Sequence, residues 1–174
     1  MSERTNGGLV RRVFLSWQRA AQPASGEGSP DVEQAFVDDA IWKTAGGVHY
    51  LSYLEPGSEQ RGTGGSEPDT RTTLRFADGP GASSPLVVIR QGTVRWKQSF
   101  LAGESSQTTL YAGGFAIPVE IETNSVLVSV AETNGFILID YFVDAAGDKQ
   151  RVKLSIRFDQ EVFDDGQAYP TGPV

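Results

Sequence analysis

The chain has 174 residues, and its 22 acidic and 15 basic side chains give a formal net charge of -7. This length fits one domain with a single core, and the acidic balance argues against binding to nucleic acid or to an anionic membrane. The absence of cysteine excludes disulfides, thiolate metal sites and cysteine nucleophiles. No stretch is apolar enough to span a membrane, and the polar first residues are not typical of a signal peptide, so we expect a cytoplasmic protein.

The N-terminal part of the chain combines strand patterns with polar segments. Residues 13–18 alternate apolar and polar side chains, which predicts a strand with one buried face. Residues 22–30 and 56–68 are rich in Gly, Ser, Pro and Glu, so we expect long mobile loops there. Between them, residues 31–42 fit two structures. Ser29 and Pro30 favour a helix start, whereas a strand would place Phe36, Ala40 and Trp42 on one face.

Strand patterns fill the rest of the chain. Residues 86–89, 126–130 and 136–143 are apolar on both faces and predict well-covered strands, whereas residues 94–101, 115–122 and 151–158 alternate. Turns such as Gly113–Gly114 and Asn134–Gly135 predict antiparallel hairpins, and a sheet of about ten strands loses its edges by closing into a barrel. We therefore expect one barrel domain over residues 1–158 and a flexible acidic tail over residues 159–174.

Three motifs stand in a characteristic order: V-H-Y-L-S-Y at 48–53, T-R-T-T-L at 70–74 and I-R-Q-G-T-V-R-W-K-Q-S-F at 89–100. Tyr111, the strand at 115–122 and a hairpin around Asp140–Tyr141 follow them. In this order, over residues 9–158, the chain resembles the bacterial calycin-like β-barrel family of unknown function typified by the Bacillus YwiB protein. The resemblance implies an all-β, closed, antiparallel up-and-down barrel of about eight to ten strands, like that of lipocalins. It also implies a strand over residues 33–43, so we expect a strand and not a helix at 31–42.

Side chains that point into the barrel are the candidate ligand-binding residues. Gln98 is in phase with the apolar Trp96 and Phe100, and Arg90 also points inward if the chain keeps its phase through Gly92. A buried guanidinium needs a carboxylate or an anionic ligand, and Asp140 is its expected partner, either in a structural network or beside a ligand. The candidate interior residues are Tyr50, Arg90, Trp96, Gln98, Phe100, Tyr111, Asp140 and Tyr141.

Catalytic chemistry has little support in the sequence. His49 is the one histidine, and we expect it at the surface or at a strand edge. Glu120 and Glu122 share a strand face opposite the apolar one, so we expect both in solvent. None of the common nucleotide, hydrolase or metalloprotease motifs occurs. We therefore expect no metal, no cofactor and no enzymatic activity.

The sequence leaves two functions open. The first is binding of a small, mostly apolar or amphipathic molecule, with an anionic end, in the barrel interior. The second is a packed barrel without a cavity that acts as a protein-interaction or structural module, as a monomer or a homodimer. An elongated cavity at the barrel centre, lined by Trp96, Gln98, Tyr141 and their neighbours, would favour the first function, and a filled interior would favour the second.

Overall fold

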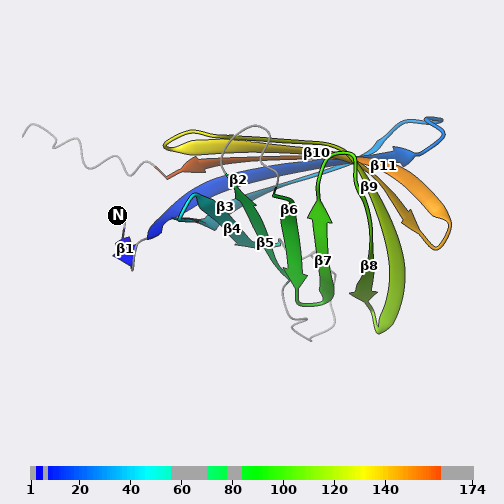
Figure 1. The fold of residues 1–174 in the computed structure, drawn as a ribbon, viewed down its shortest axis with the longest axis horizontal. Helices are drawn as coiled ribbons and strands as arrows, with labels where there is room; N and C mark the ends of the chain where they lie inside the picture. Colours follow the sequence, from blue (N-terminus) through cyan, green and yellow to red (C-terminus); the bar gives the residue numbers. More distant parts are fainter. Residues whose placement is uncertain (1–2, 6–7, 56–69, 78–83, 162–174) are drawn as a thin grey trace, which may run out of the picture.

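The computed structural model describes residues 3–5, 8–55, 70–77 and 84–161, which form a single antiparallel sheet (Figure 1). None of these residues is helical, so none belongs to a helix that could cross a membrane. The predicted all-β class is confirmed. The strands are β1 (Glu3–Thr5), β2 (Gly8–Pro23), β3 (Asp31–Ala45), β4 (Val48–Leu54), β5 (Arg71–Ala77), β6 (Leu86–Gln91), β7 (Val94–Phe100), β8 (Ser105–Ala112), β9 (Phe115–Val130), β10 (Asn134–Ala145) and β11 (Asp148–Gln160).

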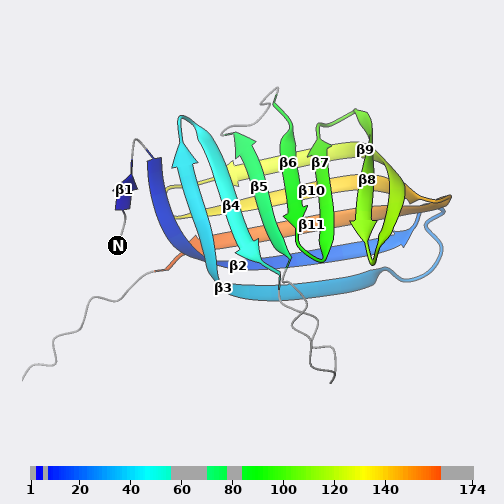
Figure 2. The ribbon, with the colours of Figure 1, turned by 90° about the horizontal axis from the view of Figure 1, so that it is seen from below.

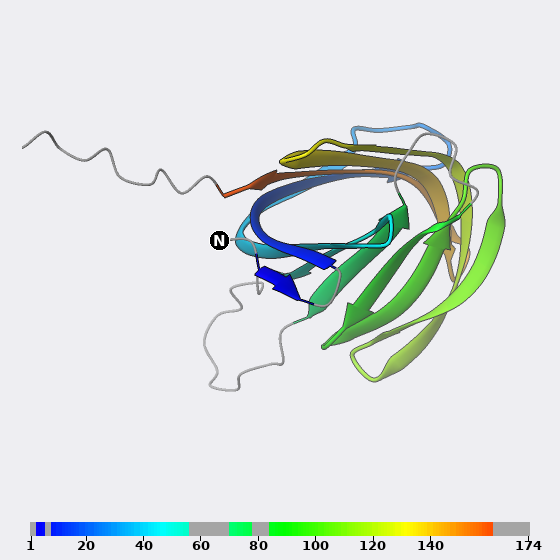
Figure 3. The ribbon, with the colours of Figure 1, turned by 60° about the vertical axis from the view of Figure 1, so that its left-hand side comes forward.

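Ten of the described strands, β2 to β11, close into a barrel (Figure 3). Each pairs with the next in the sequence, and β2 completes the ring by pairing with β11 on one side and β3 on the other. The short strand β1 adds to the first residues of β2 and lies outside the ring. The predicted closed up-and-down barrel is therefore confirmed.

The barrel wall combines long strands with short ones (Figure 2). Strands β2, β3, β9, β10 and β11 have 12 to 16 residues, whereas β4 to β8 have 6 to 8. Figure 2 shows the short strands crossing in front of the long ones, so two walls face each other across the core. Side chains alternate between the interior and the outer surface along the strands, with a change of phase at irregularities of the register in β3 and β9.

Residues 31–42 form part of strand β3, as the family resemblance implied. The helix-start signal at Ser29 and Pro30 is overridden because β3 pairs with β2 over most of its length. The register between β2 and β3 shifts between Val13 and Leu15, which lie opposite Ala40 and Val37. Asp38 and Asp39 therefore form a bulge that bends the long strand around the barrel.

The predicted boundaries of the loops and the tail differ from those in the structure, because two strands are longer than expected. Strand β2 continues to Pro23, so the first loop is shorter than expected and begins at Ala24. Residues 56–69, which include the second predicted loop, and residues 162–174 of the predicted tail lie outside the described residues. Strand β11 extends through Gln160, two residues into the segment predicted as tail.

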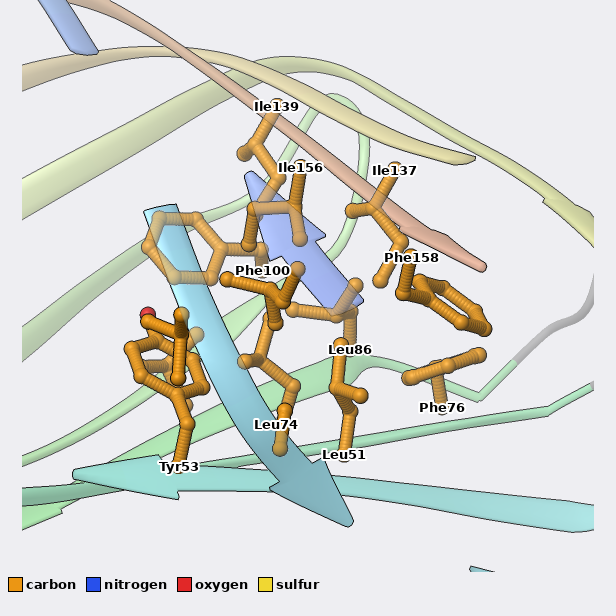
Figure 4. Close-up of a cluster of buried hydrophobic side chains, with 14 of the residues drawn as sticks. Leu51, Tyr53, Leu74, Phe76, Leu86, Phe100, Ile137, Ile139, Ile156 and Phe158 are labelled. Carbon is orange, nitrogen blue, oxygen red and sulfur yellow. The ribbon is translucent and has the colours of Figure 1, made fainter. Parts of the chain in front are cut away.

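Aromatic side chains fill one end of the core (Figure 4). Phe158 is fully buried and meets the ring of Trp42 edge-on, with 4.9 Å between ring centroids. Phe76 lies beside Phe158 in Figure 4, and Tyr53 lies on the far side of the cluster. Buried aliphatic side chains occupy the space between them: Leu51, Leu74, Leu86, Ile137, Ile139 and Ile156.

Gly135 gives the first prediction, because it is paired with Phe158 and the ring lies directly over its backbone. A Cβ at this position would overlap the ring, which Trp42 and Phe76 hold in place. We expect Gly135→Ala to lower the free energy of unfolding by about 2 kcal/mol, measured by urea denaturation. Phe158→Leu in the same background should recover part of this loss. An equal loss with either residue at position 158 would contradict the overlap.

Candidate functional site

Four inward side chains form a row across the short wall, called here the polar row: Tyr53, Thr72, Arg90 and Trp96. Tyr53 on β4 is the register partner of Thr72 on β5, Thr72 of Arg90 on β6, and Arg90 of Trp96 on β7. The next inward row is mainly apolar and consists of Leu51, Leu74, Val88 and Gln98. The polar row thus marks the boundary between the apolar core and a polar end of the barrel.

Glu55 follows β4 and neutralises Arg90. The Arg90 guanidinium donates from Nε and NH2 to the two carboxylate oxygens of Glu55, at 2.8 and 2.7 Å. The Thr72 hydroxyl donates to the same carboxylate at 2.6 Å. The two side chains of the ion pair are only 25% and 28% exposed, so water screens this pair less than a surface pair. Burial, assisted by the negative charge of Glu55, raises the pKa of Tyr53.

Tyr141 on β10 faces the short wall from the long wall. Its ring lies 4.9 Å from that of Phe100 on β7, centroid to centroid. Burial raises the pKa of Tyr141, and the nearby Arg19 on β2, which is hydrogen-bonded to it, acts in the opposite direction. Arg19 has its own carboxylate, Glu33, at 4.0 Å. Arg90 is therefore matched by a carboxylate inside the barrel, whereas Arg19 has only a long contact with Glu33, which is 57% exposed.

Three buried polar atoms near this end have no hydrogen-bond partner among the described residues. They are Oε1 of Gln98 and the indole Nε1 atoms of Trp17 and Trp96. The third tryptophan differs, because the indole N–H of Trp42 donates a hydrogen bond to Nδ1 of His49 at 3.0 Å. A buried polar group without a partner destabilises the fold, so these atoms are the places where water or a ligand group fits best.

Five of the predicted interior residues face the interior: Arg90, Trp96, Gln98, Phe100 and Tyr141. Arg90 points inward because the chain keeps its phase between β6 and β7, as the sequence suggested. These five residues come from the two facing walls. The structure thus brings most of the candidate set together at one end of the barrel.

The predicted pairing of Arg90 with Asp140 is wrong. Asp140 lies on the outer face of β10, where Arg151 donates two hydrogen bonds to it at 3.0 and 2.7 Å. The inward residues of β10 are Ile137, Ile139 and Tyr141, which are all buried. The strand is apolar on both faces, so its sequence does not show which face is inside.

Two predicted tyrosines also point outward. Tyr50 lies on the outer face of β4, where its hydroxyl accepts a hydrogen bond from Arg75 at 3.4 Å. Tyr111 on β8 is 45% exposed and lies beneath the guanidinium of Arg95. Each of these tyrosines is held by an exposed arginine, so an aromatic side chain on these strands does not indicate the interior.

His49 is buried in the core, not at the surface as predicted. Its Nδ1 lies 3.0 Å from both Trp42 Nε1 and Thr44 Oγ1, and its ring stacks on Phe76. Because an indole nitrogen can only donate, Nδ1 accepts this hydrogen bond and the ring proton lies on Nε2. His49 therefore serves the packing of the apolar end.

Sequence reasoning missed several site residues: Trp17, Arg19, Glu55 and Thr72. The period-two pattern contained the signal for some of them, because Trp17 and Arg19 continue the inward phase of Val13 and Leu15. Glu55 adjoins the predicted polar loop, so nothing in its surroundings indicated a buried ion pair. Its role follows only from closure of the barrel.

Two pockets lie on the outer surface of the barrel. A pocket of about 430 Å³ lies over β8, β9 and β10, where it is lined by Gln107, Thr109, Pro118, Glu120 and Asp144, among others. A second, of about 290 Å³, surrounds the β8–β9 hairpin. Glu120 and Glu122 are exposed on the outer face, as expected. Among the described residues, no three acidic or histidine side chains are grouped to hold a metal ion.

The described strands define a closed antiparallel β-barrel with a polar end in its interior. A family model matches residues 26–156, so the chain belongs to the family described as "Domain of unknown function (DUF1934)". The crystal structure of the YwiB protein from Bacillus subtilis is similar over 88% of this chain and 94% of that one, with a TM-score of 0.70 and 16% identity. This likeness shows the shared fold, and the predicted family resemblance is confirmed. A comparison with curated proteins gave no match.

The Glu55–Arg90 pair gives a second prediction. Glu55→Gln removes the carboxylate and leaves a largely buried guanidinium without a counter-charge, so we expect it to lower the free energy of unfolding by about 1–3 kcal/mol. The double variant Glu55→Leu with Arg90→Met removes both charges and should be more stable than Glu55→Gln. Urea denaturation measures both effects. Wild-type stability for Glu55→Gln would contradict a structural ion pair.

The outer Asp140–Arg151 pair gives a third prediction, a pH dependence. The hydrogen bonds from Arg151 hold the pKa of Asp140 below its usual value. A depressed carboxyl pKa stabilises the fold above the pKa of the unfolded chain, and this contribution is lost as the pH falls through the folded pKa. Asp140→Asn should therefore be less stable than wild type at pH 7, and the difference should shrink as the solution is acidified.

The matched control is Glu122→Gln, because Glu122 is 54% exposed and lies 3.6 Å from Lys149. A pair this exposed contributes little, so the control should change stability slightly at any pH. Thermal denaturation between pH 7 and pH 2 compares the variants. A stability difference for Asp140→Asn that does not depend on pH would contradict the pKa direction.

Proposed function

We propose that the barrel binds a small, mostly apolar molecule at the polar end of its interior and carries out no chemistry on it. The observation that carries this proposal is the group of unpartnered buried atoms on Trp17, Trp96 and Gln98. The rings of Trp96, Phe100 and Tyr141 supply an apolar surface beside these atoms. Apolar walls with a few fixed polar groups are typical of small-molecule sites.

The non-enzymatic part of the proposal rests on the surroundings of the titratable groups. His49, the one histidine, is enclosed by Trp42, Thr44 and Phe76 at the apolar end of the core. Glu55 accepts three hydrogen bonds, two from Arg90 and one from Thr72, so its carboxylate is occupied. A general base needs access to the proton that it removes, and neither group is placed for this role.

Native mass spectrometry of the full chain, purified without denaturant, is the direct test and gives the fourth prediction. We expect one small molecule per chain, at reduced occupancy in Trp96→Phe, which keeps an aromatic ring, though a smaller one, and loses the indole N–H. Phe115→Leu is the matched control because Phe115 is 72% exposed, away from the interior, and this variant should retain the molecule fully.

A second function, a protein-interaction module, has one observation in its favour. The outer surface of the long wall exposes large apolar side chains, with Phe36 at 74% and Val32 at 50% exposure. An empty barrel in the mass spectrum, together with no thermal shift from a panel of uncharged and charged alkyl and aromatic probes, would contradict the ligand proposal and leave the interaction module.

A further inference from the structure

The two polar atoms of the Gln98 side-chain amide differ in their contacts, because the nitrogen is hydrogen-bonded and the oxygen is not. Its Nε2 donates to the Ser99 carbonyl and to the Ser106 hydroxyl, both at 2.6 Å. A carbonyl can only accept, so this contact identifies which end of the amide is the nitrogen. Oε1 is consequently the atom left without a partner among the described residues, in a side chain that is 2% exposed.

The seam between β7 and β8 explains why Gln98 is held so firmly. The two strands pair only at Val94 with Ala112 and at Arg95 with Tyr111. Beyond these pairs, side chains replace the backbone ladder: Thr108 Oγ1 donates to the Lys97 carbonyl at 2.8 Å, and Gln98 binds the Ser99 carbonyl. The amide of Gln98 is therefore part of the wall, and its free oxygen has a fixed position.

Trp96 supplies the complementary group. Trp96 and Gln98 are two residues apart on one face of β7, so their side chains start about 7 Å apart. The free indole N–H is a donor and the free Gln98 Oε1 is an acceptor. A carboxamide carries both the acceptor that the Trp96 N–H needs and the donor that Gln98 Oε1 needs, and its hydrogen bonds of about 3 Å let it contact two side chains on one strand face.

The charge nearest to Trp96 disfavours an ionic head group there. Arg90, the register partner of Trp96, already has a bidentate partner in Glu55, whereas Arg19 lies on the facing wall, beside Tyr141. A carboxylate or ammonium between Trp96 and Gln98 would thus enter a low-dielectric space without a free counter-charge beside it, which is unfavourable. The expectation of an anionic ligand end depended on an uncompensated Arg90, and Glu55 removes that reason.

We infer that the ligand carries an uncharged head group that both accepts and donates hydrogen bonds, such as a carboxamide, and that Trp96 and Gln98 recognise it. This inference rests on the proposed function and names the ligand class for the same site. The head group accepts from Trp96 Nε1 and donates to Gln98 Oε1. Its apolar remainder lies against the rings of Phe100 and Tyr141.

The test is our fifth prediction and uses NMR spectra of the full chain labelled with nitrogen-15. The chain has three tryptophans and therefore three indole N–H signals, which single Trp→Phe variants assign. Hexanamide, hexanoate and hexylamine are titrated as probes that share an alkyl chain. We expect hexanamide to bind at least about tenfold more tightly than either charged probe and to shift the Trp96 signal. The Trp42 signal is the internal control, because its N–H already donates to His49.

Two variants separate recognition from folding. Gln98→Met keeps the size of the side chain but removes Oε1, and it should abolish the preference for hexanamide. Ser106→Ala removes one contact of Nε2 but leaves Oε1, so it should retain the preference. If Gln98→Met fails to fold, Ser106→Ala and the indole shifts still decide the matter.

The outcomes distinguish the inference from the proposed function. Tighter binding of hexanoate or hexylamine, with a shift at Trp96, would overturn the neutral head group and leave ligand binding intact. An unchanged preference in Gln98→Met would overturn the role of Gln98. No shift of Trp96 or Trp17 with any probe, in a protein that also retains no molecule on purification, would overturn interior binding itself.

Discussion

The structure depends on closure of the sheet through β2. This strand pairs with β11 along one edge and with β3 along the other, so no edge remains between the first and last strands of the ring. Closure turns one face of every strand into an interior. In an open sheet, Arg90 and Glu55 would be a solvent-exposed pair with little effect on stability. The same applies to the unpartnered atoms of Trp96 and Gln98, because water would satisfy them on an open surface.

The sequence predicted the inward face only where one face was polar. On β7, Arg95, Lys97 and Ser99 alternate with inward side chains, so the positions of Trp96 and Gln98 were predictable. On β10 both faces are apolar, because cations cover the outer rings: Arg157 lies over Phe136, and Lys149 over Phe142. Hydrophobicity alone therefore could not decide between Asp140 and Tyr141 as the inward residue.

Residues 31–42 show a different limit, the competition between local and non-local interactions. The helix-start signal at Ser29 and Pro30 is worth about 1 kcal/mol, whereas β3 gains a full ladder with β2 and buries Val37, Ala40 and Trp42. Non-local pairing exceeds the local preference, and only the family resemblance indicated this outcome from sequence. The ion pair of Glu55 was beyond prediction for the same reason, since its partner lies 35 residues away.

The seam between β7 and β8 connects the fold with recognition. A full ladder there would satisfy the Ser99 carbonyl from the backbone of β8, and the Gln98 amide would need other partners for its nitrogen. Because the ladder stops at Arg95, Gln98 Nε2 donates to that carbonyl, and Oε1 is left without a hydrogen-bond partner among the described residues. The short ladder between β7 and β8 thus fixes the orientation of the uncharged Gln98 amide. Because Arg90, the charge beside Trp96, is already paired with Glu55, such dipoles, and not net charge, are what this part of the interior offers for selecting a ligand.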